Sequence, residues 1–143
     1  MSATADHAES SLAARLGFQS DQVVQEIGYD EDVDMEFRDE IEGFIGNDLV
    51  DEDYDDVADA VLLWFRDEDG DLTDTLVDAT ELVDDEALIL LLTPKTGREG
   101  FVEASDISDA AKQAGLALGK SFSVGKEWSA QRLKTPKAAK SKR

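Results

Sequence analysis

The sequence predicts a small three-layer α/β sandwich, in which helices cover both faces of a mainly parallel sheet and a C-terminal hairpin adds an antiparallel edge. Two observations predict this class. Apolar runs of strand length alternate with segments of helical spacing, as in successive βαβ units. The runs are also continuous rather than alternating, which is typical of strands buried on both faces. At 143 residues the chain has the length of one domain.

The domain is predicted to span residues 10–134. A flexible N-terminal segment at 1–9, made of small and polar residues, is expected before it. A basic, disordered tail at 135–143 is expected after it, because this segment is rich in lysine and lacks apolar periodicity.

The first half of the domain is predicted to begin with a short helix at 10–18 that ends at Gly17, followed by a strand at 22–28. A longer helix is predicted at 32–46, and a short strand at 47–50. The longer helix is indicated by apolar residues that recur at helical spacing and form one stripe, namely Val33, Phe37, Ile41, Phe44 and Ile45.

The second half of the domain is predicted to hold two buried strands, two helices and a terminal hairpin. In chain order these are a strand at 60–66, a helix at 72–83, a strand at 86–94, a helix at 105–119 and a hairpin at 120–134. Ser105 and Gly119 are the expected ends of the last helix, because serine caps helices and glycine ends them.

The composition argues against several kinds of site. With no cysteine, the chain has no disulfide, thiol nucleophile or cysteine-based metal site. Its one histidine, His7, lies in the N-terminal segment, which argues against a Ser-His-Asp or histidine-based metal site. No catalytic residue is singled out, because 34 acidic residues offer too many equivalent carboxylate pairs. Since neither a signal peptide nor an apolar stretch of roughly 20 residues is present, we expect a soluble, cytoplasmic protein.

The stretch WFRDEDGDLTD has the look of a calcium loop. With its glycine at position six of an EF-hand loop, two aspartates stand at positions three and five. Positions one and twelve, however, are Phe65 and Leu76, so both end ligands are missing. We therefore expect no metal site here. The acidic residues are interpreted as a polar turn that leaves a strand, with Asp71 or Thr73 as the cap of the next helix.

The turn after the first predicted strand, EIGYDEDVD, is where a doubly wound sheet would bind a nucleotide. This turn has one glycine, Gly28, followed by carboxylates that would repel phosphate. A GxxxxGK[ST] loop is also missing from the sequence. No cofactor is therefore expected.

The charge is strongly asymmetric, because 29 of the 34 acidic residues but only 3 of the 14 basic ones lie in residues 1–91. If the terminal hairpin borders the strand at 86–94, five basic residues are expected near one another: Lys95, Arg98, Lys126, Arg132 and Lys134. The tail adds Lys137, Lys140, Lys142 and Arg143. In one interpretation Trp128 and Leu133 are core residues of the hairpin, and the tail is a solubilising or self-pairing end. In the other, the tail contacts an acidic partner or RNA.

Several short motifs resemble those of a family of small, mainly actinobacterial proteins of unknown function. They are Leu16–Gly17, Pro94–Lys95 at the end of an apolar strand, and a C-terminal segment similar to Glu-x-Trp-Ser-x-x-Arg that contains Glu127, Trp128, Ser129 and Arg132. The resemblance covers about residues 10–134. It implies a degenerate Rossmann-like or methyltransferase-like domain with no established activity. The acidic turn after the first strand departs from a cofactor site.

Together these observations favour a non-enzymatic binding or regulatory protein with an acidic body and a basic C-terminal segment. Its predicted interaction surface consists of Lys95, Arg98, Glu127, Trp128, Ser129 and Arg132. A protein partner is expected, nucleic acid only through the tail, and no membrane, because the acidic body repels phosphates. Two alternatives remain open: a degenerate methyltransferase-like or nucleotide-binding domain with a small-molecule ligand, and an acidic mimic of nucleic acid.

Overall fold

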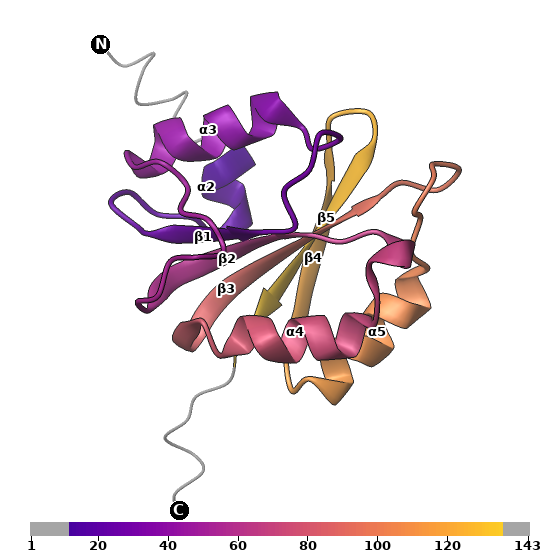
Figure 1. Ribbon diagram of the computed structural model, residues 1–143. Coiled ribbons are helices and arrows are strands. Elements are labelled where there is room, and N and C mark those ends of the chain that lie inside the picture. Colours follow the sequence, from indigo (N-terminus) through magenta and orange to yellow (C-terminus); the bar gives the residue numbers. More distant parts are fainter. Residues whose placement is uncertain (1–11, 136–143) are drawn as a thin grey trace, which may run out of the picture.

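The computed structural model describes residues 12–135, and within them five strands form one sheet in the order β1-β2-β3-β5-β4 (Figure 1). The elements in chain order are α2 (Leu12–Leu16), β1 (Val24–Ile27), α3 (Met35–Ile45), β2 (Ala58–Trp64), α4 (Leu72–Thr80), β3 (Val83–Pro94), α5 (Ala104–Gln113), β4 (Ala117–Val124) and β5 (Trp128–Lys134). The first three strands are parallel, whereas β5 runs antiparallel to both β3 and β4. The predicted fold class is therefore confirmed. The segment at 1–9 and the tail beyond Thr135 lie outside the described residues.

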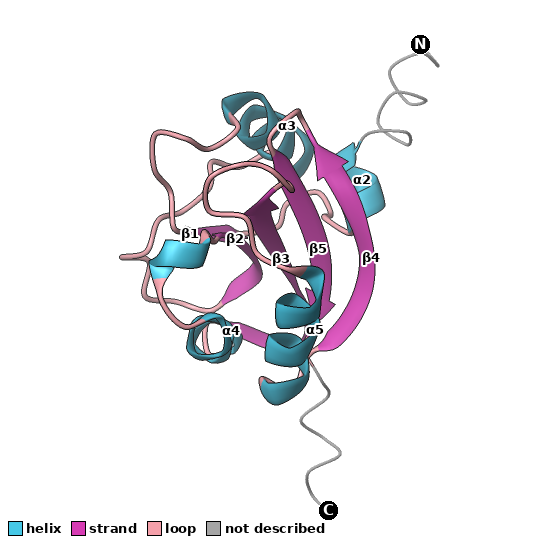
Figure 2. Cartoon of the chain, turned by 90° about the vertical axis from the view of Figure 1, so that its right-hand side faces the viewer, coloured by secondary structure: helices cyan, strands magenta, loops and turns pink. Residues whose placement is uncertain are grey.

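Helices cover both faces of the sheet, with α2 and α3 on one face and α4 and α5 on the other (Figures 1 and 2). β2 shows why its sequence is an unbroken apolar run. Leu62 and Trp64 face the α2/α3 layer, whereas Val61 and Leu63 face the α4/α5 layer. All four side chains are at most 1% exposed. Burying each of them contributes roughly 1.5–3 kcal/mol to folding.

Aspartates at the helix starts act as caps. The Phe37 backbone N–H donates to Asp34 Oδ1 at 2.9 Å, and the Asp74 N–H donates to Asp71 Oδ1 at 3.0 Å. The Asp71 cap follows a 3-10 turn at Asp67–Asp69, so the interpretation of this acidic stretch as a polar turn with a helix cap is confirmed. α4 is shorter than predicted, because residues from 83 onward already pair with β2.

The helix predicted at 105–119 is wrong at both ends. Glu103 rather than Ser105 precedes α5, and Gly119 lies within β4 rather than at a helix end. Gly115, at φ +80°, reverses the chain, and the residues after it pair with β5. Strand pairing therefore outweighs the local helical spacing, and such pairing depends on a neighbour that is distant in sequence.

The segments that follow β1 in the chain pair with it on both of its sides. After α3, Val50 forms an isolated parallel bridge to β1 within the strand predicted at 47–50. The Glu26 N–H donates to Val50 O at 2.8 Å, and the Val50 N–H donates to Val24 O at 3.0 Å. β2 instead bonds to the Val23 carbonyl, on the opposite side of β1, because successive peptide groups alternate in direction. The chain thus crosses from one side of β1 to the other, which makes the β1–β2 junction a topological switch point.

The end of the described chain is fixed to β3. The Thr135 hydroxyl donates to Asp84 O at 3.0 Å and accepts from the Ala87 N–H at 2.8 Å, so the folded part includes this residue. None of the helices within residues 12–135 has the length and apolar character needed to span a membrane.

Candidate functional site at the carboxyl edge of the sheet

Ligands of open α/β sheets bind outside the carboxyl ends of the strands, at the switch point. We call this end of the molecule the carboxyl edge. It is formed by the loops that follow the parallel strands and by the β4–β5 turn, at residues 28–34, 51–53, 65–71, 95–103 and 125–127. The opposite end, at residues 17–22, 81–87, 114–119 and 132–135, is called the amino edge.

Arg66 joins the loops of the carboxyl edge. Its Nε and Nη2 donate to the two carboxylate oxygens of Asp32, with 3.1 Å between Nε and Oδ2. Its Nη1 donates to Gly28 O at 2.8 Å and to Asp69 Oδ2 at 3.3 Å. The Arg66 side chain is only 9% exposed, so its charge is balanced within the chain rather than by solvent. The guanidinium therefore lies across the switch point, between the loops that follow β1 and β2.

The pKa values of the two partners agree with a stable ion pair. The hydrogen bond from Arg66 lowers the pKa of Asp32, even though burial acts in the other direction. Burial alone would lower the pKa of Arg66, but the hydrogen bonds and charges of Asp32 and Asp69 outweigh it and raise that pKa. Both groups are therefore charged at neutral pH.

A second ion pair lies under the same edge, on the α3 side. Arg38 donates to both carboxylate oxygens of Glu26, from Nε at 2.6 Å and from Nη2 at 2.8 Å. The Trp64 indole N–H donates to Glu26 Oε2 at 2.9 Å. Glu26 is only 5% exposed, so three donors satisfy a buried carboxylate. The hydrogen bonds that Arg38 donates to Glu26 raise the pKa of Arg38.

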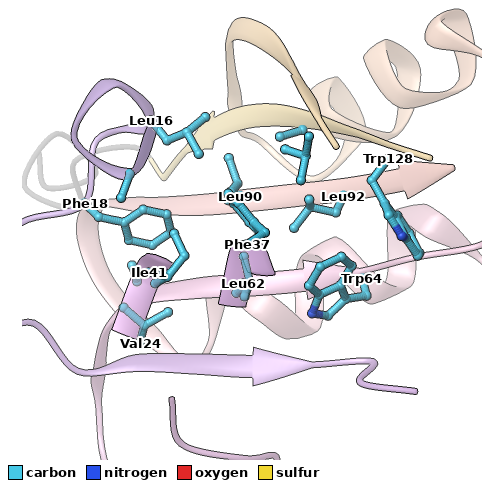
Figure 3. Close-up of a cluster of buried hydrophobic side chains, with 14 of the residues drawn as sticks. Leu16, Phe18, Val24, Phe37, Ile41, Leu62, Trp64, Leu90, Leu92 and Trp128 are labelled. Carbon is cyan, nitrogen blue, oxygen red and sulfur yellow. The ribbon is translucent and has the colours of Figure 1, made fainter. Parts of the chain in front are cut away.

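Two tryptophans close the core beneath these charges (Figure 3). The rings of Trp64 and Trp128 meet edge to face, with centroids 4.9 Å apart and planes at 78°. The Trp128 indole N–H donates to Asp32 O at 3.1 Å, and the Arg66 guanidinium lies 5.3 Å from the centre of the Trp128 ring. The aromatic and cation–π contacts thus connect β5 to β2 and the loop after it, and the hydrogen bond to Asp32 connects β5 to the loop that follows β1.

Gly28 shows how tightly the switch point is packed. Its φ is +83°, and a Cβ atom there would overlap the carbonyl oxygen of Trp64. Its backbone N–H donates to Glu52 Oε2 at 2.9 Å. In dinucleotide-binding turns, glycines let the backbone approach the cofactor. Here the N–H and C=O of Gly28 are both used within the chain, by Glu52 and Arg66. These residues do not fit an open cofactor turn.

The outer surface of the carboxyl edge is strongly acidic. Its exposed carboxylates belong to Asp30, Glu31, Asp32, Asp51, Glu52, Asp53, Asp67, Glu68, Asp69, Asp71, Glu99, Glu103 and Glu127. A hollow of about 370 Å³ lies among them and is lined by Asp32, Arg66, Glu68, Pro94, Arg98, Glu99, Glu127 and Trp128. Within residues 12–135, no group of three or more His, Asp or Glu side chains is placed to hold a metal ion.

The antiparallel β5 separates the basic residues that were predicted to lie together. β5 begins beside Pro94, at the carboxyl edge, and ends beside Leu88, at the amino edge. The prediction of one basic cluster is therefore wrong. The carboxyl edge holds Lys95, Arg98 and Lys126, whereas the amino edge holds Arg132 and Lys134.

The other members of the predicted interaction surface lie at the start of β5. Lys95 Nζ donates to Gly125 O at 2.9 Å, which fixes the β4–β5 turn. Trp128 is only 3% exposed and Ser129 is partly buried, whereas Glu127 is exposed. The four basic tail residues lie outside the described part of the chain.

Glu26, Arg38 and Arg66 form the centre of the edge, and none of them was predicted as a site residue from the sequence. Two signals were present. Glu26 interrupts the apolar strand at 22–28, and Arg38 and Arg66 are two of only three basic residues in the acidic first 91 positions. A rare cation among many acids is a candidate for a buried ion pair, because charged side chains are almost never fully buried unless paired.

The arrangement of the sheet and its covering helices is that of a Rossmann-like methyltransferase fold. A SAM-dependent methyltransferase from Aquifex aeolicus matches 90% of this chain and 92% of its own, with a TM-score of 0.57 and 13% identity. Magnesium protoporphyrin IX methyltransferase from Synechocystis, solved with bound SAM, matches 91% of this chain and 78% of its own, with a TM-score of 0.54 and 11% identity. At such low identity these similarities establish the fold alone.

The chain belongs to the family described as protein of unknown function (DUF3052), whose model matches residues 13–137. An uncharacterized protein of Mycobacterium tuberculosis is 50% identical over 139 residues, which cover 97% of this chain and 87% of that protein. An uncharacterized protein of Mycobacterium bovis matches to the same extent. The resemblance to a mainly actinobacterial family of unknown function is thus confirmed.

Proposed function

We propose that this protein is a non-enzymatic binding protein, in which the carboxyl edge of a methyltransferase-like sheet is an acidic docking face for a basic segment of a protein partner. One observation supports this most directly. The Arg66 guanidinium lies across the switch point and is satisfied by Gly28, Asp32 and Asp69. These bonds hold the loops together where a cofactor would otherwise enter, and the carboxylates on the outer side stay exposed.

The charged groups beneath the edge suit a structural role better than catalysis. Glu26 accepts from Arg38 and Trp64, and Asp32 accepts from Arg66. A general acid or base works best with a pKa near the working pH. The lowered pKa of Asp32 is the opposite of that adjustment.

The charge of the face defines the partner. The protein has a net charge of −20, and its field attracts basic molecules at rates that fall as salt increases. The same field repels nucleic acid. Besides Asp32, which is bound to Arg66, three exposed carboxylates line the hollow beside Trp128, those of Glu68, Glu99 and Glu127. A lysine or arginine side chain of the partner would enter between them and be held by charge-assisted hydrogen bonds.

Two variants with the same change in charge test this proposal. Asp30→Asn with Glu31→Gln removes two exposed charges from the carboxyl edge, whereas Asp84→Asn with Asp85→Asn removes two from the amino edge. Each immobilised protein is incubated with native lysate at low and high salt, and bound proteins are identified by mass spectrometry. We expect one dominant protein that the amino-edge variant retains, that the carboxyl-edge variant binds at least about tenfold less, and that high salt releases. Equal losses in both variants would contradict a docking face at the carboxyl edge.

A second candidate function is binding of S-adenosylmethionine. A hollow of about 440 Å³ lies beside Val50 and is lined by Glu26, Tyr29, Arg38, Leu49, Asp51, Glu52 and Asp53. Because this cofactor carries a positive sulfonium, an acidic site would not repel it as it would phosphate. Binding at the switch point would require Glu52 to release the Gly28 N–H and Arg66 to release the Gly28 carbonyl. Saturable binding of the cofactor would favour this candidate over the docking face.

A further inference from the structure

Arg132 differs from the other partly buried arginines. Arg38 and Arg66 each bind carboxylates of this chain. Arg132 is also partly buried, yet within residues 12–135 its guanidinium has neither an ion pair nor a hydrogen bond to a protein atom. The chain has 34 acidic residues, so a shortage of carboxylates does not explain this. A guanidinium whose donors are unused within the chain remains available to an anion from outside it.

Two glycines leave the Arg132 side chain uncovered. Gly17 ends α2 at φ +110°, and a Cβ there would lie 3.5 Å from Arg132 Nη2. Gly119, on the neighbouring strand β4, would place a Cβ 3.3 Å from Arg132 Cβ. A larger side chain at Gly17 would lie against the guanidinium, and one at Gly119 would lie against the Cβ and backbone of Arg132. The turn after α2 and the edge strand β4 therefore form two walls with the cation between them.

These walls enclose a hollow of about 540 Å³ at the amino edge. Its cations are Lys120, Arg132 and Lys134, and its carboxylates are Asp59 and Glu86. Asp59 Oδ2 already accepts from the Val23 N–H at 2.8 Å. Cations thus outnumber carboxylates here, although acids dominate the molecule as a whole.

The hollow also has an apolar side. Leu88 lines it on the same face of the sheet as Arg132, and a Cβ at Gly17 would lie 3.6 Å from Leu88 Cδ2. Leu88 is partly buried, and a ligand that covers it removes the rest of its apolar surface from water. Small-molecule sites combine such apolar walls with a few polar groups, in clefts of roughly 300–1,000 Å³.

We propose that this hollow binds a small organic anion, with its carboxylate or phosphate on the Arg132 guanidinium and its apolar part against Leu88. A guanidinium presents paired N–H groups that match both oxygens of such an anion. The hollow lies at the amino edge, opposite the proposed docking face, so the two proposals are independent. It is also outside the carboxyl-edge crevice in which the fold would place a cofactor.

The test uses hexanoate, its neutral analogue hexanamide and inorganic phosphate, titrated separately into the full chain labelled with ¹⁵N and ¹³C. We expect saturable shifts of the Arg132 Nε–H and the Leu88 methyl signals with hexanoate. Hexanamide and phosphate should each bind at least about tenfold more weakly, since each lacks one of the two contacts. Arg132→Gln should weaken hexanoate binding at least about tenfold, whereas Arg98→Gln, an exposed arginine at the carboxyl edge, should change it less than about twofold.

Three results would overturn the proposal: no saturable shift with hexanoate, equal binding of hexanoate and hexanamide, or equal weakening by the two arginine variants. The Arg132→Lys variant separates charge from geometry. It should bind hexanoate more tightly than Arg132→Gln and more weakly than the unaltered chain. Wild-type affinity in Arg132→Lys would contradict recognition by paired N–H groups.

Discussion

The arginines at the two edges of the sheet differ in their partners, because Arg66 is paired within residues 12–135 and Arg132 is not. At the carboxyl edge, Arg66 is 9% exposed on its side chain and is bound by Asp32, Asp69 and the carbonyl of Gly28. At the amino edge, Arg132 is partly buried and binds no carboxylate of residues 12–135. Both edges are rich in acids, so the difference lies in geometry rather than in the supply of carboxylates.

The difference distinguishes an arginine that stabilises the fold from one whose donors can bind a ligand. A guanidinium satisfied inside the chain holds loops together but has no free donors for a ligand. An unpaired guanidinium in a hollow contributes little to folding and keeps its donors free. A crevice inherited with the fold therefore need not be the place where this protein binds small molecules.

The largest expected effect compares two glycines, one at each edge. Both glycines have positive φ. A Cβ at Gly28 would overlap the Trp64 carbonyl oxygen, whereas a Cβ at Gly17 would only make ordinary van der Waals contacts, at 3.5 Å or more. Gly28→Ala should lower the free energy of unfolding by about 3–4 kcal/mol, because backbone strain and a steric overlap add together. Gly17→Ala should lower it by only about 1–2 kcal/mol, from strain alone. Urea denaturation measures both, and equal losses would contradict the tight packing of the switch point.

The next effect compares the two arginines directly. Arg66→Gln should lower the free energy of unfolding by about 2–3 kcal/mol, because the Gly28 carbonyl loses its donor and two carboxylates lose their partner. Arg132→Gln should change it by less than about 0.5 kcal/mol, since no internal bond is broken. The same denaturation experiment applies, with Arg98→Gln as an exposed control. A large loss in Arg132→Gln would mean that its guanidinium is part of the fold.

The smallest effect concerns pH. Because Arg66 lowers the pKa of Asp32, the folded state is stabilised above the unfolded pKa of about 3.9, and this stabilisation is lost as pH falls through the folded pKa. Asp32→Asn should therefore reduce the fall in stability below about pH 4 and leave its slope above about pH 5 unchanged. Thermal melts across this range measure it, with Asp84→Asn as a control at the amino edge. If stability falls below about pH 4 as steeply in Asp32→Asn as in the unaltered chain, the result would contradict the ion pair.

Much of the fold could be predicted from the sequence, because local patterns determine it. The apolar runs predicted as strands at 60–66 and 86–94 overlap β2 and β3, and the stripe predicted as a helix at 32–46 overlaps α3, whose apolar side faces inward. The end of α5 was missed, since β4 forms only through pairing with a strand that follows it in sequence. Such pairing leaves a weak local signal.

The site was harder to predict, for two physical reasons. The Glu26–Arg38 and Asp32–Arg66 pairs join residues 12 and 34 positions apart, so no local spacing reveals them. The predicted basic cluster failed because β5 runs antiparallel to β3, which sends Lys126 and Arg132 to opposite edges. Position along a strand, rather than distance in sequence, decides which charges meet.

The most direct test of the closed carboxyl edge is a titration of the ¹⁵N-labelled chain with S-adenosylmethionine, observed by NMR. Three N–H groups report on the switch point: the Gly28 amide, bound to Glu52, and the Trp64 and Trp128 indoles, bound to Glu26 and Asp32. Because these donors are satisfied within the chain, none of the three signals should shift in a saturable way. Saturable shifts of all three would contradict the account and would make this protein a cofactor-binding member of its fold.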